Sequence, residues 1–333
     1  MKAQRLSFPA PIDEHPLTLA DLAKPSPAEH EVLLRVHACG ICHTDLHVVE
    51  GDLRLPTLPL IPGHQVIGRI EATGLSVTKW KKGDRVGVPW LFSTCGKCEF
   101  CHSGKENLCD NSRFTGYHAN GGFAEYMVVH EDFVYPLPAS FGDIEAAPLL
   151  CAGVIGYRAL RLSEIIPGGR IGLYGFGASA HIAIQIARHL GCEVYVFTRS
   201  KQHRDLAEEL GASWTGSAED TPPQKIDSAV IFAPAGHLVP ASLGVLKKGG
   251  TVALAGIYMS SIPEMEYKLV YDERTIRSVA NSTREDVKEL LEVAAAIPIK
   301  TEVETFPLEE ANLALQKLKK SEIRGSGVLT IAE

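Results

Sequence analysis

The segment RIGLYGFGASAHIAIQIARHLG, Arg170–Gly191, predicts a buried strand, a glycine-rich turn and a helix in direct succession. Gly175, Gly177 and Ala180 form the pattern G-x-G-x-x-A, which is typical of dinucleotide-binding turns in this context. Gly175 permits the tight turn, Gly177 lets the backbone approach a pyrophosphate, and Ala180 lets the helix pack closely. The alternative is an ordinary glycine-rich turn, but the context favours a pyrophosphate site at the helix N-terminus.

Strand and helix continue to alternate after this segment. Such alternation predicts an α/β fold with a doubly wound parallel sheet of the Rossmann type, which we place at residues 153–281. The expected strands include EVYVFTRS (193–200), DSAVIFAPAG (227–236) and TVALAGIY (251–258), with helices over 201–212 and 237–250.

The chain before residue 152 has a different pattern. Short β-like runs alternate with Gly and Pro, which predicts an antiparallel or barrel-like β-rich region. These runs are HEVLLRVHAC (30–39), HQVIGRIEATG (64–74), GDRVGVPWL (83–91) and FAEYMVVHEDFVYPLP (123–138). Residues 282–333 add two amphipathic helices and a closing strand, whose position does not follow from periodicity alone.

The composition limits the classes of function. The chain has 333 residues, of which 45% are hydrophobic and 22% charged, enough for about two domains. Its 33 Lys and Arg face 40 Asp and Glu with no basic stripe, which argues against a nucleic-acid partner. Because no signal-peptide or membrane-spanning run is seen, we expect a cytoplasmic protein without a membrane partner. In that compartment its eight cysteines should be reduced or metal-bound rather than paired in disulfides.

The end of the second expected strand bears on the choice of cofactor. Dinucleotide folds that use NAD place an acidic residue there, but this chain has Thr198, Arg199 and Ser200. A guanidinium with two neighbouring hydroxyls suits the 2′-phosphate of NADP. The alternative is that Arg199 is a solvated surface charge, with NAD(H) as the cofactor.

Four cysteines follow the spacing C-x-x-C-x-x-C-x7-C in a lobe at about residues 90–112. Four thiolates so closely spaced suit one tetrahedral zinc ion with no open position, which is a structural site. An iron–sulfur cluster is the main alternative by spacing, whereas the compartment argues against disulfides and the charge against a nucleic-acid knuckle. The four residues are Cys95, Cys98, Cys101 and Cys109.

Three further residues stand in suggestive settings: Cys42 in ACGICHTDLH, His64 in IPGHQVIG and Cys151 in APLLCAGVIGY. Two thiolates and one imidazole form a set that leaves zinc a fourth position for water or substrate. The residues alone leave an alternative open, since a thiol in an apolar run is ordinarily a core residue and a lone His is usually just hydrogen-bonded.

These motifs, together with the cysteine lobe and GFGASA, resemble in order and spacing the zinc-dependent alcohol dehydrogenases of the medium-chain dehydrogenase/reductase superfamily, over nearly the whole chain. The resemblance implies a GroES-like catalytic domain over residues 1–152 and a return to that domain over 282–333. It also implies a homo-oligomer, a dimer or a tetramer, joined near Thr275–Val279.

The resemblance further implies residue roles. Cys42, His64 and Cys151 would hold a catalytic zinc, with Asp45 orienting His64. Zinc would activate a primary alcohol or an aldehyde for hydride exchange with NADP(H), or with NAD(H) as the other possibility. Thr44 would bind the substrate oxygen, and His47 would end a proton relay through the cofactor ribose. His43 would touch the pyrophosphate. Trp90 would line the substrate pocket or belong to the core.

The chain departs from the family pattern at two positions. Gln65 stands where many relatives have Glu after the ligating His, and Ser326 where relatives often have Arg for the pyrophosphate. Two other functions stay open: a non-catalytic zinc- and nucleotide-binding protein, and a zinc-free quinone or enoyl reductase. A pure binder has no need for Thr44 with His47, and a zinc-free reductase has none for the three metal ligands, so the sequence favours the alcohol dehydrogenase.

Overall fold

The computed structural model describes residues 1–332, which form two compact units. The first unit contains residues 1–151, 283–296 and those from 301 on, and the second contains 152–282 and 297–300. The sequence analysis assigned 297–300 to the catalytic segment. They belong to the second unit, where the Gln185 side chain exchanges two hydrogen bonds with the backbone of Lys300, each 2.8 Å long.

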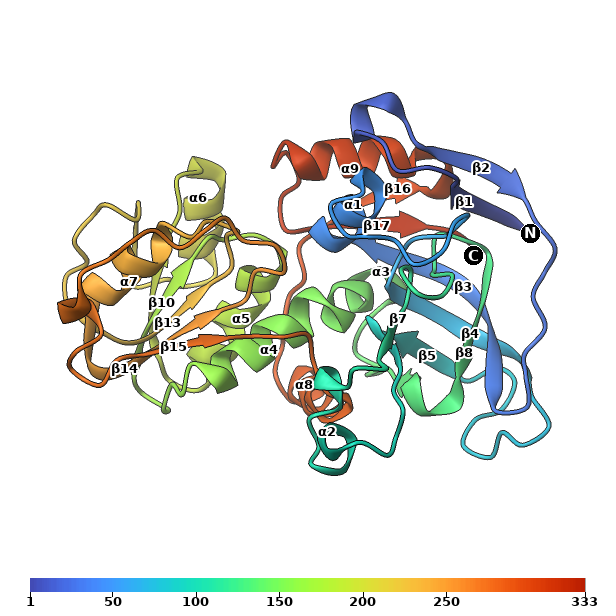
Figure 1. Cartoon of the computed structure of the whole chain (residues 1–333), viewed down its shortest axis with the longest axis horizontal. Coiled ribbons are helices and arrows are strands. Elements are labelled where there is room, and N and C mark those ends of the chain that lie inside the picture. The colour runs from blue at the N-terminus through green and yellow to red at the C-terminus, as the bar shows by residue number, and fades with distance from the viewer. Residues whose placement is uncertain (333) are drawn as a thin grey trace. The chain divides into compact units, whose positions relative to one another are not determined.

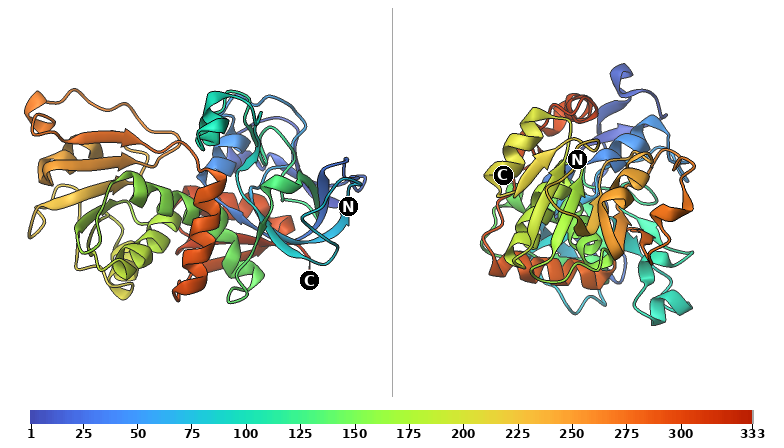
Figure 2. Two further views of the ribbon diagram at one scale, coloured as in Figure 1. Left: turned by 90° about the horizontal axis from the view of Figure 1, so that it is seen from below. Right: turned by 90° about the vertical axis from the view of Figure 1, so that its left-hand side faces the viewer.

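The second unit is built on a six-stranded parallel sheet in the order β12-β11-β10-β13-β14-β15. Its central strands are buried almost throughout, as expected for a sheet covered on both faces. Helices α4 and α5 pack against each other beside the sheet (Figures 1 and 2). The elements are α4 (Ala152–Leu162), β10 (Arg170–Tyr174), α5 (Ala178–His189), β11 (Glu193–Phe197), α6 (Lys201–Glu209), β12 (Trp214–Gly216), β13 (Ile226–Ile231), α7 (Leu238–Val245), β14 (Leu246–Leu254), η5 (Tyr267–Leu269) and β15 (Thr275–Ser278).

One boundary differs from the sequence prediction. The stretch 237–250 was expected to be helical, but α7 ends at Val245 and β14 begins at Leu246. Leu246 pairs with Ile226 across a bulge, and the regular register resumes at Thr251. The early start of β14 is therefore set by pairing with a neighbouring strand, which local pattern does not show.

The first unit is built on a seven-stranded mixed sheet in the order β16-β17-β3-β4-β5-β9, with β8 also paired to β3. The C-terminal strands lie beside N-terminal β3, since β17 pairs with it antiparallel (Figure 1). Two separate two-stranded sheets, β1-β2 and β6-β7, belong to the same unit. The strands of the unit are β1 (Lys2–Leu6), β2 (Leu17–Asp21), β3 (Glu31–Ile41), β4 (Gln65–Thr73), β5 (Arg85–Val88), β6 (Leu91–Ser93), β7 (Arg113–Phe114), β8 (Tyr126–His130), β9 (Tyr135–Pro136), β16 (Val303–Pro307) and β17 (Ser326–Thr330).

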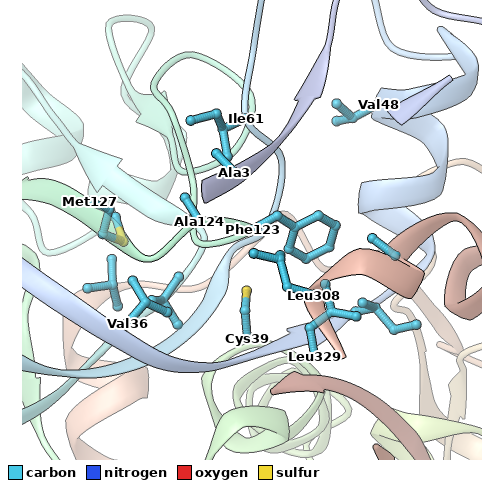
Figure 3. Close-up of a cluster of buried hydrophobic side chains, with 14 of the residues drawn as sticks. Ala3, Val36, Cys39, Val48, Ile61, Phe123, Ala124, Met127, Leu308 and Leu329 are labelled. Atoms are coloured by element: carbon cyan, nitrogen blue, oxygen red, sulfur yellow. The ribbon is translucent and has the colours of Figure 1, made fainter. Parts of the chain in front are cut away.

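Short helices complete this unit around a continuous apolar core. Ala3, Val36 and Phe123 meet Leu308 and Leu329 in that core, so both ends of the chain contribute to it (Figure 3). The helices are η1 (Ile12–Glu14), α1 (His43–Glu50), α2 (Glu99–His102), η2 (Glu106–Leu108), η3 (Glu131–Phe133), α3 (Asp143–Ala146), η4 (Ala147–Leu150), α8 (Arg284–Ala296), η6 (Leu308–Glu310) and α9 (Ala311–Lys319).

Among residues 1–332, no helix combines the length and apolar character needed to span a bilayer. The cytoplasmic location stays a prediction.

Candidate active site and metal sites

Strand pairing in the first unit brings Cys42 and His64 together. Cys42 directly follows β3 and His64 directly precedes β4, and the antiparallel register of these strands sets Gly40 opposite Gln65. Two segments 22 residues apart in sequence therefore meet at one end of the sheet. Cys151 directly follows η4, which packs on both β3 and β4 and adds the third residue to the same place.

The three side chains have the geometry of a three-ligand metal site. Cys42 Sγ lies 3.2 Å from His64 Nε2 and 4.0 Å from Cys151 Sγ, and all three ligand atoms lie within 4.8 Å of one another. Zinc–ligand lengths predict about 3.6 Å between sulfur and nitrogen and about 3.8 Å between two sulfurs in a tetrahedral site. The donor set therefore fits one zinc ion.

Asp45 fixes the orientation of the His64 ring. Its Oδ1 accepts hydrogen bonds from His64 Nδ1 at 2.8 Å and from the backbone N–H of Gly63 at 3.2 Å, while Oδ2 accepts from the N–H of Cys42 at 2.9 Å. Because Nδ1 is bound to Asp45, Nε2 is the nitrogen that points at the thiols. Carboxylate–histidine pairs of this kind hold metal-ligating imidazoles in metalloproteins.

The electrostatics of the cluster favour a bound cation. A hydrogen bond with Cys151, aided by His64, outweighs burial and lowers the pKa of the Cys42 thiol well below its ordinary value. Burial lowers the pKa of His64, but the charges of Asp45 and Cys42 outweigh it and raise that pKa to about 10. Both shifts favour a negatively charged sulfur beside a positive charge, and a bound metal ion would supply that positive charge.

Helix α1 carries the polar residues expected around the substrate. Cys42 is its N-cap, with Sγ accepting from the N–H of Thr44 at 3.3 Å, and Asp45 completes a capping box. Thr44 is 7% exposed, and His47 lies three residues on, on the same side of the helix. His43, the first residue of α1, is exposed.

Asp52 is a residue that the sequence analysis missed. Its carboxylate lies 2.8 Å from His47 Nδ1. The chain reaches this position because Gly51, the C-cap of α1, has a φ of +83° that turns the backbone back over the last helical turn. The sequence signal for this contact was the Gly-Asp pair directly after the helix, which places an acidic residue five positions beyond His47.

The ring of His64 contacts Trp90, which in turn stacks with two further aromatic rings. Trp90, only 9% exposed, meets the His64 ring edge-on, with centroids 4.8 Å apart at an interplanar angle of 74°. Phe114 and Tyr117 stack with Trp90 at 5.1 and 5.9 Å. Trp90, Phe114 and Tyr117 therefore form an aromatic wall behind the metal ligand His64, and Trp90 is the member that contacts it. Gln65, the neutral departure from the family pattern, is 2% exposed.

The second group of thiols also has metal-site geometry. Cys101 Sγ lies 3.5 Å from Cys98 Sγ and 3.9 Å from Cys95 Sγ, and with Cys109 all four lie within 4.8 Å of one another. A backbone hydrogen bond from Lys97 contributes most to lowering the pKa of Cys95 to about 6, which favours a thiolate. These separations match one tetrahedral ion, whereas an iron–sulfur cluster places several atoms between its thiolates.

Glu106, another residue missed in the sequence, attaches this lobe to the rest of the first unit. It lies between the third and fourth cysteines in η2 and is 5% exposed. Its Oε1 accepts from the backbone N–H of Arg284 at 3.0 Å and from the guanidinium Nε at 3.3 Å. The lobe is thereby fixed to the start of α8.

The glycine-rich turn of the second unit has the features of a pyrophosphate site. Gly175 has φ +85°, and a Cβ there would come within 2.9 Å of the Ala233 side chain, so glycine is required. Gly177 is the N-cap of α5, makes no side-chain cap hydrogen bond and has open space where a Cβ would be. The first N–H groups of α5 are therefore available to an anion, and fully buried Ala180 lies in its first turn.

The residues expected to select the cofactor lie at the end of β11. The backbone of Thr198 donates to Gly216 at 2.7 Å and accepts from Arg204 Nε at 2.8 Å, which fixes this strand end. Ser200 caps α6, accepting from the N–H of His203 at 3.4 Å, and keeps a hydroxyl proton to donate. Arg199 is exposed. A guanidinium, a hydroxyl and a helix N-terminus thus gather at one strand end.

Comparisons with known proteins agree with this architecture. Residues 28–139 match the family model of the alcohol dehydrogenase GroES-like domain, and residues 180–296 match that of the zinc-binding dehydrogenases. The chain is 45% identical to a probable alcohol dehydrogenase of Mycobacterium tuberculosis, covering 99% of this chain and 97% of the relative. It is 37% identical to an alcohol dehydrogenase of Geobacillus stearothermophilus, covering 95% and 96%.

Solved structures with similar folds come from the same group. A cinnamyl alcohol dehydrogenase of Sorghum bicolor is 28% identical with a TM-score of 0.90, covering 98% of this chain and 97% of that one. A cobalt- and zinc-bound thermostable alcohol dehydrogenase of Pyrobaculum aerophilum is 26% identical with a TM-score of 0.91, covering 99% of both. The chain belongs to the zinc-type alcohol dehydrogenases of the medium-chain dehydrogenase/reductase superfamily.

Proposed function

We propose that this chain is a zinc-dependent dehydrogenase that interconverts primary alcohols and aldehydes, with NADP(H) preferred over NAD(H). The observation that carries the proposal is the set of Cys42, His64 and Cys151, whose ligand atoms lie within 4.8 Å of one another. Beside it, one short helix carries both the hydroxyl of Thr44 and the imidazole of His47.

Each of these side chains has a separate role in the reaction. When bound, zinc supplies a Lewis acid that polarises the oxygen of the alcohol or aldehyde. Thr44 hydrogen-bonds that oxygen and passes its proton on, and His47 exchanges the proton with solvent. Asp45 holds His64 in its ligating orientation, and Asp52 fixes the ring of His47 by a 2.8 Å contact.

The preference for NADP(H) is supported by the charge at the end of β11. Arg199 is exposed there and Ser200 opens α6, whose N-terminus also favours a phosphate. No acidic side chain stands at residues 198–200 to bind the ribose hydroxyls of NAD. We assign the pyrophosphate to His43 and to the turn formed by Gly175, Gly177 and Ala180.

We assign Cys95, Cys98, Cys101 and Cys109 to a structural zinc, because four thiolates leave no position for substrate. We further propose a homo-oligomer joined through β15, which is an edge strand of its sheet and pairs with β14. Tyr267 and Tyr271, on the segment leading into β15, are 73% and 68% exposed and suit such an interface.

Substitution of a ligand with a matched control tests the catalytic assignment. Cys151→Ser should abolish aldehyde reduction in zinc-loaded protein while the fold is retained. Cys192→Ser, the same change at a buried thiol of the second unit, should leave turnover near normal. Near-normal activity of Cys151→Ser would overturn the ligand assignment. Zinc-loaded wild-type protein that binds NADPH but turns over no alcohol or aldehyde would favour a binding protein.

A further inference from the structure

Tyr117 connects two parts of the candidate site that are distant in sequence. It follows β7, after the cysteine lobe, and is half-buried. Its ring stacks with Trp90, with centroids 5.9 Å apart at an angle of 27°, and its hydroxyl donates to the backbone carbonyl of Arg54 at 2.7 Å. One side chain therefore touches both the wall behind His64 and the segment that follows α1.

The contact with Trp90 leads directly to a metal ligand. Trp90 also contacts His64, at 4.8 Å in an edge-on arrangement. Phe114 stacks nearly parallel to Trp90, at 9°, so the indole is held by rings that come from the 114–117 turn. Aromatic pairs of this kind restrict ring orientation as well as burying surface. The turn thereby holds the indole that contacts the ring of His64.

The hydrogen bond to Arg54 restrains a mostly exposed segment, residues 54–59, from which the partly buried Leu55 side chain packs against the core. Within the described part of the chain, the hydroxyl of Tyr117 is the one hydrogen-bond partner of residues 54–59. Just before them, Asp52 makes the 2.8 Å contact with His47 Nδ1, and the N–H of Leu53 reaches the His47 carbonyl at 3.4 Å. Movement of residues 54–59 would therefore displace Asp52 from the histidine of the relay.

We propose that Tyr117 is a positioning residue for the reaction. Its hydroxyl tethers residues 54–59, which keeps the preceding Asp52 on His47, and its ring holds Trp90 against His64. The expected effect of Tyr117 on turnover rests on the proposed function, whereas its hydrogen bond to Arg54 exists in the protein without substrate. The hydroxyl and the ring have separate effects, so two substitutions at this position distinguish them.

Tyr117→Phe removes the hydroxyl and keeps the ring. The peptide bond after exposed Arg54 is a trypsin site within the tethered segment, so native-state cleavage reports the tether without any substrate. Loss of one hydrogen bond should speed cleavage there about fivefold, since the bond contributes about 1 kcal/mol and 1.4 kcal/mol is tenfold. Tyr126→Phe is the control, because it makes the same change at a tyrosine of β8 in the same unit.

Kinetics test the consequence for the relay. In Tyr117→Phe we expect kcat to fall about fivefold with the KM for NADPH unchanged, and added imidazole to restore part of the rate by replacing the misplaced base. Tyr117→Leu also loses the stack, so it should release zinc to a chelator about two- to tenfold faster than Tyr117→Phe.

Cleavage after Arg54 at the wild-type rate in Tyr117→Phe would overturn the proposal. So would a reduced kcat that imidazole does not restore. If wild-type protein turns over no alcohol or aldehyde, the proposed function fails, but the cleavage rates still decide whether Tyr117 tethers the segment.

Discussion

Asp45→Asn is the substitution whose effect can be worked out most fully from the contacts. Asp45 is 1% exposed and accepts three hydrogen bonds, two at Oδ1 and one at Oδ2. An asparagine amide of nearly the same shape has one acceptor oxygen. If that oxygen serves His64 and Gly63, the NH2 group faces the N–H of Cys42, and this donor loses its partner.

The expected magnitudes follow from these contacts. A buried unpaired donor costs about 1–3 kcal/mol, and replacing a charged acceptor by a neutral one weakens the His64 bond by about 1 kcal/mol more. The free energy of unfolding of the zinc-free protein should therefore fall by about 2–4 kcal/mol. Because the neutral amide holds His64 less firmly, zinc affinity at this site should fall about 10- to 100-fold.

Competition with a chromophoric chelator measures this affinity, and urea unfolding of the zinc-free protein measures the stability. Asp220→Asn is the matched control: this exposed carboxylate accepts hydrogen bonds from Ser217 in the second unit, remote in sequence from the thiols. Its substitution should leave both zinc ions in place. Zinc affinity in Asp45→Asn within about twofold of the wild-type value would refute the assigned role of Asp45 in zinc binding.

Three further changes test other parts of the molecule. Cys109→Ser should leave one zinc per chain and lower the Tm by about 5–10 °C, while the surviving protein keeps its turnover; an unchanged Tm would contradict the structural-zinc assignment. Arg199→Gln should raise the KM for NADPH about tenfold and leave that for NADH unchanged, and equal effects on both would make Arg199 a bystander. Burial raises the pKa of Asp143, but hydrogen bonds from Arg85 and His37 outweigh it and hold that pKa below its usual range. The stabilisation that the Asp143 carboxylate gives the folded state is therefore present above its unfolded pKa of about 3.9 and is lost as pH falls through its folded pKa. Between pH 6 and pH 3 the Tm of Asp143→Asn should therefore fall less steeply than that of the wild-type protein.

The sequence predicted those features that depend on neighbours along the chain. The strand, turn and helix around Gly175 require glycine at φ +85°, and a sequence pattern can express such a local requirement. The four lobe cysteines are similarly close in sequence, so one short loop suffices to bring their sulfur atoms within 4.8 Å. The expected Rossmann and GroES-like architecture is confirmed.

Features that depend on pairing between distant segments were not derivable in this way. Cys42 and His64 meet because β3 and β4 pair in one register, and Cys151 joins them because η4 packs on both strands. Periodicity gives neither the register nor the packing, so their grouping rested on resemblance to a family. The same reason explains why Tyr117 was missed, since its contacts are with Trp90 and a backbone carbonyl 63 residues away.

The measurement that tests the central claim most directly is aldehyde reduction with NADPH and with NADH on one preparation whose zinc content per chain is counted. We predict two zinc ions per chain and turnover that is clearly faster with NADPH at limiting cofactor. Faster turnover with NADH would contradict the assignment of Arg199 to a 2′-phosphate. Absence of turnover with either cofactor, in protein that carries both zinc ions, would contradict the assignment of Cys42, His64 and Cys151 to a catalytic centre.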